Sequence, residues 1–382
     1  MSTRSRRVLA AAIATLGACS VTLAQLAPAV PEAAPESLIT SERLMQTLRS
    51  LPAKRASWTD DAGRAGLRKT ERLIVERLKA LGYAPELDPV DAIGTRSRPE
   101  AAPEAQADPN APDPAPPWNN IVVDIPGVGV PGEVLVFSAH IDAVADSPGA
   151  DDDGSGTAAL LEAARVLSGR SMQRTVRLIF FNLEEVGLVG SRAYTQRLKE
   201  ALDAGRERVV GMASLDGIGF YTDTPDSQKS PLPPLPGFTP PTVGDFLAIG
   251  GVLRHRMFSQ ALARAMRESE PRLKLVVVDM LPLAPPDLLR SDHAPFLALG
   301  APAVIATDTA NFRSPHYHKS TDTIETIDVD RFTLAARGVA GAIYRLAGPP
   351  GTALVELIPP ARPAVKPVPR PEPTPSPNPP AP

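Results

Sequence analysis

The chain has 382 residues, enough for one large domain with extensions. Its formal net charge of -3 gives no reason to expect nucleic-acid binding, and a hydrophobic fraction of 43% allows an ordinary buried core. The 44 prolines gather in a few stretches, which therefore mark extensions and insertions.

The first 30 residues have the pattern of an export signal. An arginine-rich start precedes an apolar run over residues 8–18, which is too short to span a membrane as a conventional helix. The sequence LGAC, ending at Cys19, resembles a lipobox and would make this residue a lipid anchor; simple cleavage after Ala24 or near Ala29 is the alternative. We expect an exported protein, periplasmic or extracellular, with membrane contact only through a lipid at Cys19. Because Cys19 is the only cysteine, we expect no disulfide within the chain and no thiolate metal ligand.

Residues 36–350 carry the alternating pattern of one catalytic domain. We expect helices over residues 41–51, 62–81, 157–167, 191–201, 253–266, 292–299 and 328–346, and strands over 83–90, 120–125, 134–137, 175–182, 209–215, 246–249, 273–278 and 302–307. Because strands and helices alternate through the middle of the chain, we predict an α/β fold. Its central sheet should be mixed, mostly parallel and flanked by helices on both faces.

Three proline-rich segments interrupt or follow this domain. Residues 97–117 read as a solvated insertion, and residues 225–241 as a surface lobe near the rim of the site. Residues 359–382 form a proline-rich tail that we expect to be disordered.

Acidic residues and histidines occur at the ends of several expected strands or in nearby loops. They are His140 with Asp142, the triplet Asp151–Asp153, Glu184 with Glu185, Asp216, and His316 with His318. Strand ends that are distant in the sequence can meet along one edge of a sheet. Carboxylates and imidazoles are zinc ligands, and a carboxylate that bridges two zinc ions builds a site that activates water.

Each of these features has an ordinary explanation when it is taken alone. The aspartate triplet could be a solvated loop, and Asp153 fits the N-cap of the following helix. Glu184 and Glu185 could be surface charge, and His140 could be a hydrogen-bonded core residue. These explanations fail together, because four of the five histidines lie in the sequence blocks quoted in the next paragraph.

These blocks, in this order, resemble a known enzyme family. They read SAHIDAV, PGADDDGSGTAALLE, FFNLEEVGLVGSRAY, SLDGIGF, SDHAPFLALGAPAV and PHYHKSTDTIETID. The chain resembles the zinc-dependent exopeptidases of the bacterial leucyl aminopeptidase and aminopeptidase S type (metallopeptidase clan MH). The resemblance covers residues 120–346 and implies the zinc exopeptidase fold.

The resemblance also implies a ligand set for two zinc ions. His140 and Asp216 would bind one ion, Glu185 and His318 would bind the other, and Asp152 would bridge both. The short run that follows the last histidine selects His318 over His316.

Further roles come from the same resemblance. Glu184 would be the general base that takes a proton from a zinc-bridging water and returns it to the leaving amine. Asp142 would orient the imidazole of His140 by holding the ring nitrogen that does not bind zinc. Asp292 and His293 would support the site.

We therefore expect a dizinc metallo-aminopeptidase that acts on peptides with a free N-terminus. A glutaminyl-peptide cyclotransferase is an alternative on the same fold, but the intact His140 and Asp142 favour hydrolysis. A carboxypeptidase or dipeptidase would need a basic group for the substrate carboxylate, which the sequence does not identify. A metal-stabilised binding protein is a further alternative, against which the complete ligand set argues.

Overall fold

The computed structural model describes most of the predicted domain, namely residues 33–90, 118–231, 234, 239–280 and 286–359. The expected export signal over residues 1–30, with Cys19, and the insertion 97–117 lie outside the described residues. Parts of the insertion 225–241 and all but the first residue of the tail 359–382 do so too. No helix within the described part is long and apolar enough to cross a bilayer.

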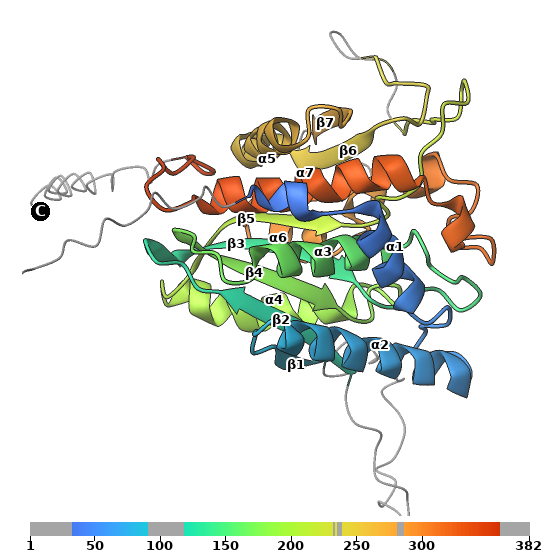
Figure 1. Cartoon of the computed structure of the whole chain (residues 1–382), viewed down its shortest axis with the longest axis horizontal. Helices are drawn as coiled ribbons and strands as arrows, with labels where there is room; N and C mark the ends of the chain where they lie inside the picture. Colours follow the sequence, from blue (N-terminus) through green and yellow to red (C-terminus); the bar gives the residue numbers. More distant parts are fainter. Residues whose placement is uncertain (1–32, 91–117, 232–233, 235–238, 281–285, 360–382) are drawn as a thin grey trace, which may run out of the picture. The chain divides into compact units, whose positions relative to one another are not determined.

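Eight strands form one sheet. They are β1 (Glu86–Val90), β2 (Trp118–Ile125), β3 (Val130–His140), β4 (Arg174–Phe181), β5 (Arg208–Leu215), β6 (Leu247–Val252), β7 (Leu275–Met280) and β8 (Ala303–Thr307). Their spatial order is β1-β2-β4-β3-β5-β8-β6-β7. The central strands β4, β3, β5 and β8 run parallel, as do β6 and β7. The pairs β1–β2, β2–β4 and β6–β8 are antiparallel. The prediction of a mixed, mostly parallel sheet is therefore confirmed (Figure 1).

Helices cover both faces of this sheet, as predicted. They are α1 (Ser41–Ser50), α2 (Asp61–Ala80), α3 (Gly154–Leu167), α4 (Val189–Asp203), α5 (Arg256–Ser269), α6 (His293–Ala298) and α7 (Val329–Ala347). The helix α3 packs against α1, α2 and α7, and α7 also packs against α5, so these helices share one layer and the larger core (Figure 1). The helices α4 and α6 contact each other and pack on the opposite face over a second, smaller core.

Side-chain caps determine where several helices begin. Thr40, Asp60, Asp153 and Asp328 each accept a hydrogen bond from a backbone N–H in the first turn of the helix that follows. The helix predicted from Thr157 therefore begins three residues earlier, at Gly154, because the Asp153 carboxylate accepts from Gly156 N at 3.0 Å. This early start brings the N-terminus of α3 to the aspartate loop.

Candidate metal centre and active site

Three neighbouring parallel strands bring most of the predicted residues to one edge of the sheet. β4, β3 and β5 lie side by side and end at Phe181, His140 and Leu215. Glu184, Glu185 and Asp216 follow directly in the adjoining loops. Parallel strands end at the same edge of a sheet, which is where α/β proteins bind ligands. Asp152 joins them from the loop before α3, and His318 joins them from the loop between β8 and α7.

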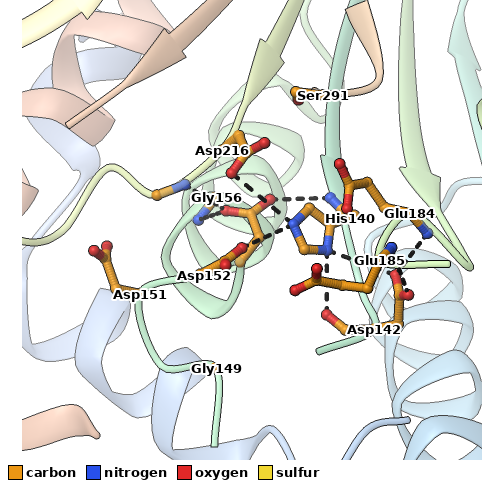
Figure 2. A network of polar contacts seen from close by, with 12 residues as sticks. His140, Asp142, Gly149, Asp151, Asp152, Gly156, Glu184, Glu185, Asp216 and Ser291 are labelled. Carbon is orange, nitrogen blue, oxygen red and sulfur yellow. Dashed lines mark hydrogen bonds and ion pairs between the residues drawn. The ribbon is translucent and has the colours of Figure 1, made fainter. Parts of the chain in front are cut away.

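The five predicted zinc ligands form one cluster. Figure 2 shows His140, Asp152, Glu185 and Asp216 of this cluster. Possible ligand atoms of His140, Asp152 and Asp216 lie within 4.8 Å of one another, and so do those of Asp152, Glu185 and His318. Asp152 therefore belongs to two overlapping groups of three. A third group joins His140, Glu184 and Glu185.

The carboxylate of Asp152 faces both halves of the cluster. Its Oδ1 lies 3.1 Å from His140 Nε2, and its Oδ2 lies 3.1 Å from His318 Nε2. His140 Nε2 is also 4.0 Å from Asp216 Oδ1, whereas His318 Nε2 is 3.2 Å from Glu185 Oε2. The geometry thus pairs His140 with Asp216 and His318 with Glu185, on either side of Asp152.

Asp142 supports both the histidine and the paired glutamates. Its backbone carbonyl lies 3.2 Å from His140 Nδ1, and its carboxylate Oδ1 lies 3.6 Å from the same nitrogen. The carboxylate accepts hydrogen bonds from the backbone N–H groups of Glu184 and Glu185, each at 3.1 Å. Asp142 therefore fixes the loop after β4 as well as the imidazole (Figure 2).

The other two aspartates of the triplet connect the loops that carry the predicted ligands. Asp153 Oδ2 accepts from His140 N at 2.9 Å, and its Oδ1 accepts from Gly217 N at 3.2 Å, next to Asp216. Asp151 Oδ1 accepts from Gly219 N at 2.7 Å. Asp151 and Asp153 are thus engaged with backbone groups, while the side chain of Asp152 faces the histidines.

Asp292 and His293 have different surroundings. Asp292 is fully buried, and its pKa is raised to about 7 by burial and by the negative charges of Asp142 and Asp216. His293 is buried at the start of α6, and burial lowers its pKa to about 4. Among the described residues, the groups able to hold a metal do not include His293. Asp292 is not in those groups either, but the charges of Asp142 and Asp216 act on it, so it lies close to the cluster.

The electrostatics of the cluster are those of a site built for cations. Burial raises the pKa of Glu184 well above its usual value, and the carboxylates of Asp216 and Asp292 add to the shift. Burial and the charge of Asp152 raise the pKa of Glu185 to about 7. Burial lowers the pKa of His318, but hydrogen bonds to Asp152 and Glu185 outweigh it and raise the pKa to about 10. Without a metal, some of these crowded groups must therefore be protonated, because their negative charges would otherwise repel one another.

The donor set fits zinc. Nitrogen and carboxylate oxygen are zinc ligands, and buried charge of this density needs a cation. The Oε1 atom of Glu185 is buried and has no hydrogen-bond partner in the described part of the chain, so it is available as a ligand.

The segment between α1 and α2 contacts the loops of the cluster through Arg55. Arg55 is only 3% exposed, and its guanidinium donates to the backbone carbonyls of Ile141 at 3.0 Å, Pro148 at 2.9 Å and Gly149 at 2.8 Å. Its own carbonyl accepts from Ala143 N at 2.9 Å. These bonds connect the turn after β3 with the aspartate loop. No sequence pattern points to this role, because Arg55 lies far before His140 in the chain and outside every motif.

A cavity of about 450 Å³ opens beside the cluster. Its walls include Asp152, Glu184, Glu185, Asp216 and His318, so the cluster is accessible. Residues 229–231, 240 and 241 also line it, so the proline-rich insertion contributes to the cavity wall.

Tyr317 and Arg290 are two further lining residues that lie outside the predicted ligand set. The Tyr317 ring stacks on the His318 imidazole with 3.8 Å between ring centroids, and its hydroxyl accepts from Arg290 Nη2 at 2.9 Å. Because this hydroxyl accepts from Arg290, its own proton remains available to donate to another group. Tyr317 adjoins a predicted ligand in the sequence, but its partner is 27 residues away and no local signal connects the two.

A cluster of carboxylates and histidines at the carboxyl edge of a mostly parallel sheet is the arrangement of an α/β metallohydrolase. The sequence profile of Peptidase family M28 matches residues 120–343, more than half of the chain and the whole of the cluster. The chain belongs to peptidase family M28. This membership confirms the family resemblance seen in the motifs.

Two curated relatives are similar over the same region. The uncharacterized protein YfbL of Escherichia coli (strain K12) is 30% identical over 239 residues, which cover 60% of this chain and 71% of YfbL. Aminopeptidase YwaD of Bacillus subtilis (strain 168) is 29% identical over 227 residues, which cover 56% of this chain and 41% of YwaD. The chain therefore spans less than half the length of this second relative.

Solved structures show the same fold. The LapA aminopeptidase of Legionella pneumophila superposes with a TM-score of 0.58 at 20% identity, covering 83% of this chain and 74% of LapA. A glutaminyl cyclase of Fimbriiglobus ruber superposes with a TM-score of 0.56 at 16% identity, covering 80% of this chain and 95% of the cyclase. At these identities the likeness establishes the fold, and the choice between peptidase and cyclase depends on the site.

Proposed function

We propose that this protein is a dizinc aminopeptidase that removes the first residue from peptides with a free N-terminus. The observation that carries the proposal is the position of Asp152, whose two carboxylate oxygens each lie 3.1 Å from a different histidine. His140 and Asp216 would hold one ion, Glu185 and His318 the other, and Asp152 would contact both. Zinc at these positions would supply activation of water and polarisation of the scissile carbonyl.

Glu184 is the residue in position to move the proton. It lies in the cluster with His140 and Glu185 and lines the cavity. A carboxylate in this position can accept a proton from the attacking water and later release it to the leaving amine. The backbone N–H of Glu184 is fixed by Asp142, which holds the base in place.

Tyr317 supplies a donor for the oxygen on which negative charge develops. Tyr317 lines the same cavity as Glu184, and its hydroxyl accepts a hydrogen bond from Arg290. A donor that is oriented before the reaction stabilises the transition state without reorganisation.

The defining experiment compares aminoacyl-anilides with their N-acetylated forms on zinc-loaded protein. An aminopeptidase should hydrolyse only the forms with a free amine. Zinc should be counted in the same preparation, with about two ions per chain expected. Cyclisation of glutaminyl peptides with one ion per chain would instead establish the cyclase, which shares the fold.

Replacement of the base provides a second test. Glu184→Gln should bind zinc as the parent protein does and lose about 100-fold or more in kcat, because general-base catalysis contributes about 10²–10⁴-fold. Glu200→Gln, on α4 and outside the cavity lining, is the matched control. Full activity of Glu184→Gln would remove Glu184 from this role.

We also propose that the protein is exported, on the basis of the basic and apolar pattern of residues 1–18. Fractionation of cells that produce the full chain, followed by mass analysis of its N-terminus, distinguishes a lipid at Cys19 from simple cleavage. Retention in the cytoplasm of an intact chain would refute export.

A further inference from the structure

The cavity beside the metal centre has a floor made by one face of β6, β7 and β8. Six residues of these strands line the cavity, and their pairing arranges them in two rows of three. The row nearer the start of β6 is Val276–Ala248–Thr307, and the other is Val278–Gly250–Ile305. The floor therefore carries no charged side chain.

Alternation along β6 separates the cavity face from the core face. Leu247 and Ile249 are fully buried in the larger core, where α5 packs against this strand. A Cβ atom built on Gly250 would lie 3.1 Å from Ile305 Cγ2 and 3.5 Å from Leu288 Cδ2, both of which line the cavity. Gly250 therefore faces the cavity.

The two rows lie at different depths from the metal centre. Asp216 follows Leu215, which pairs with Ala306 of β8, so Thr307 lies at the level of the ligands. Ile305 and its partner Gly250 lie two residues further along the strand. At ~3.3 Å per residue, this second row is about 7 Å deeper.

Gly250 forms a notch at the centre of the deeper row. Its neighbours Val278 and Ile305 are β-branched and typical of a strand, whereas a glycine weakens a strand and often marks the close approach of a ligand. Phe246, Leu288 and Phe312 add apolar walls. A leucine or phenylalanine side chain that enters from the metal centre would extend further toward this notch than an alanine side chain.

We propose that this floor binds the side chain of the first substrate residue, that it favours a large apolar or aromatic residue, and that Gly250 sets the size limit. The proposal rests on the aminopeptidase function proposed above. The other charged residues that line the cavity, outside the acidic cluster, lie off the floor: Arg192, Lys229, Asp287 and Arg290. A charged first residue would consequently find no partner on the floor itself.

The test compares phenylalanyl- and alanyl-anilides by their kcat/KM values. The parent protein should prefer phenylalanine over both alanine and lysine. Gly250→Val should lower the ratio of phenylalanine to alanine at least tenfold, because the new side chain fills the notch. Gly132→Val should not change the ratio, because this glycine is exposed and a Cβ atom there would have only Arg206 O within 4 Å, at 3.7 Å.

A second variant changes the cavity in the opposite direction and does not overfill it. Ile305→Ala should enlarge the deeper row and raise the activity on a naphthylalanyl substrate relative to the phenylalanyl one. An unchanged ratio in folded, zinc-loaded Gly250→Val, or a parent preference for small or charged first residues, would overturn the inference. Neither result would affect the proposed aminopeptidase activity, which fails only if no free-amine substrate is cleaved.

Discussion

The Tyr317 hydroxyl accepts a hydrogen bond from Arg290. Its proposed role as a donor can be tested without changing any of the proposed metal ligands. Tyr317→Phe keeps the ring that stacks on His318 and removes only the donor. We expect kcat to fall about 100-fold, or about 2.7 kcal/mol, as for other lost transition-state donors. KM and zinc content should change little, since the hydroxyl acts on charge that develops during the reaction.

Tyr344→Phe is the control for this substitution, because Tyr344 lies on α7 and does not line the cavity. Steady-state kinetics and metal analysis on both variants give the comparison. A large rise in KM with unchanged kcat would assign Tyr317 to substrate binding instead.

The residues that can be predicted from the sequence alone share one property. His140, Glu184 and Asp216 each end or follow a strongly apolar strand, so their placement at the sheet edge follows from the strand pattern. Tyr317, Arg290 and Arg55 act through contacts between loops, and no local pattern predicts such contacts. The division of the ligands into two pairs is implied by the family resemblance, whereas the spacing of the residues does not predict it.

At the scale of secondary-structure elements, Arg55 connects two loops that carry proposed zinc ligands to the segment between α1 and α2. The planar guanidinium reaches carbonyls of Pro52, Ile141, Pro148 and Gly149 at 2.7–3.0 Å. Arg55→Lys keeps the charge but cannot span these acceptors. We expect zinc affinity to fall about 10- to 100-fold, the range found when outer partners of ligands are removed.

Titration with a competing chelator measures this loss, and exposed Arg43→Lys on α1 is the control. The chain should remain folded, since the sheet and both cores are formed by other residues. Unchanged zinc affinity in Arg55→Lys would show that positive charge, rather than the shape of the guanidinium, is what the loops require.

Element boundaries are less predictable than element types. The α3 helix starts early because Asp153 caps it, and β3 extends back to Val130, four residues before its predicted start, because this residue pairs with Arg174 of β4. Both changes arise from single hydrogen-bonding partners, which periodicity does not register. A strand is nevertheless expected from the sequence at the place of each strand in the described part of the domain.

At the scale of the whole molecule, the antiparallel pairing of β6 with β8 determines where the cavity lies. β6 runs antiparallel to β8 and parallel to β7, so Ala248 at the start of β6 lies opposite Thr307 at the end of β8. The α5 helix packs on one face of these strands, and the other face lines the cavity. The strand order that produces this arrangement depends on pairing between distant segments, which the sequence pattern does not predict.

Protons and a metal ion would compete for the same side chains of the cluster. In the metal-free state the pKa of Glu185 is raised to about 7 from 4.5, and that of His318 to about 10 from 6.5. Protonated forms therefore stabilise the metal-free fold; this stability is fully present below the unfolded-state pKa values and is lost as the pH rises through about 7 and about 10. Zinc requires the deprotonated ligands, so its affinity should rise over the same interval.

Thermal unfolding between pH 6 and pH 10, with zinc and with a chelator, tests this coupling. The melting temperature of the metal-free protein should fall as the pH rises, and the gap to the zinc-loaded protein should widen. His318→Asn removes both the group with the higher pKa and a proposed zinc ligand, so it should reduce the gap and flatten its change above pH 7, whereas His255→Asn should leave both unchanged. A gap that stays constant or narrows toward pH 10 would show that protons and zinc do not compete for these ligands, and that the crowding of His318, Asp152 and Glu185 is relieved in another way.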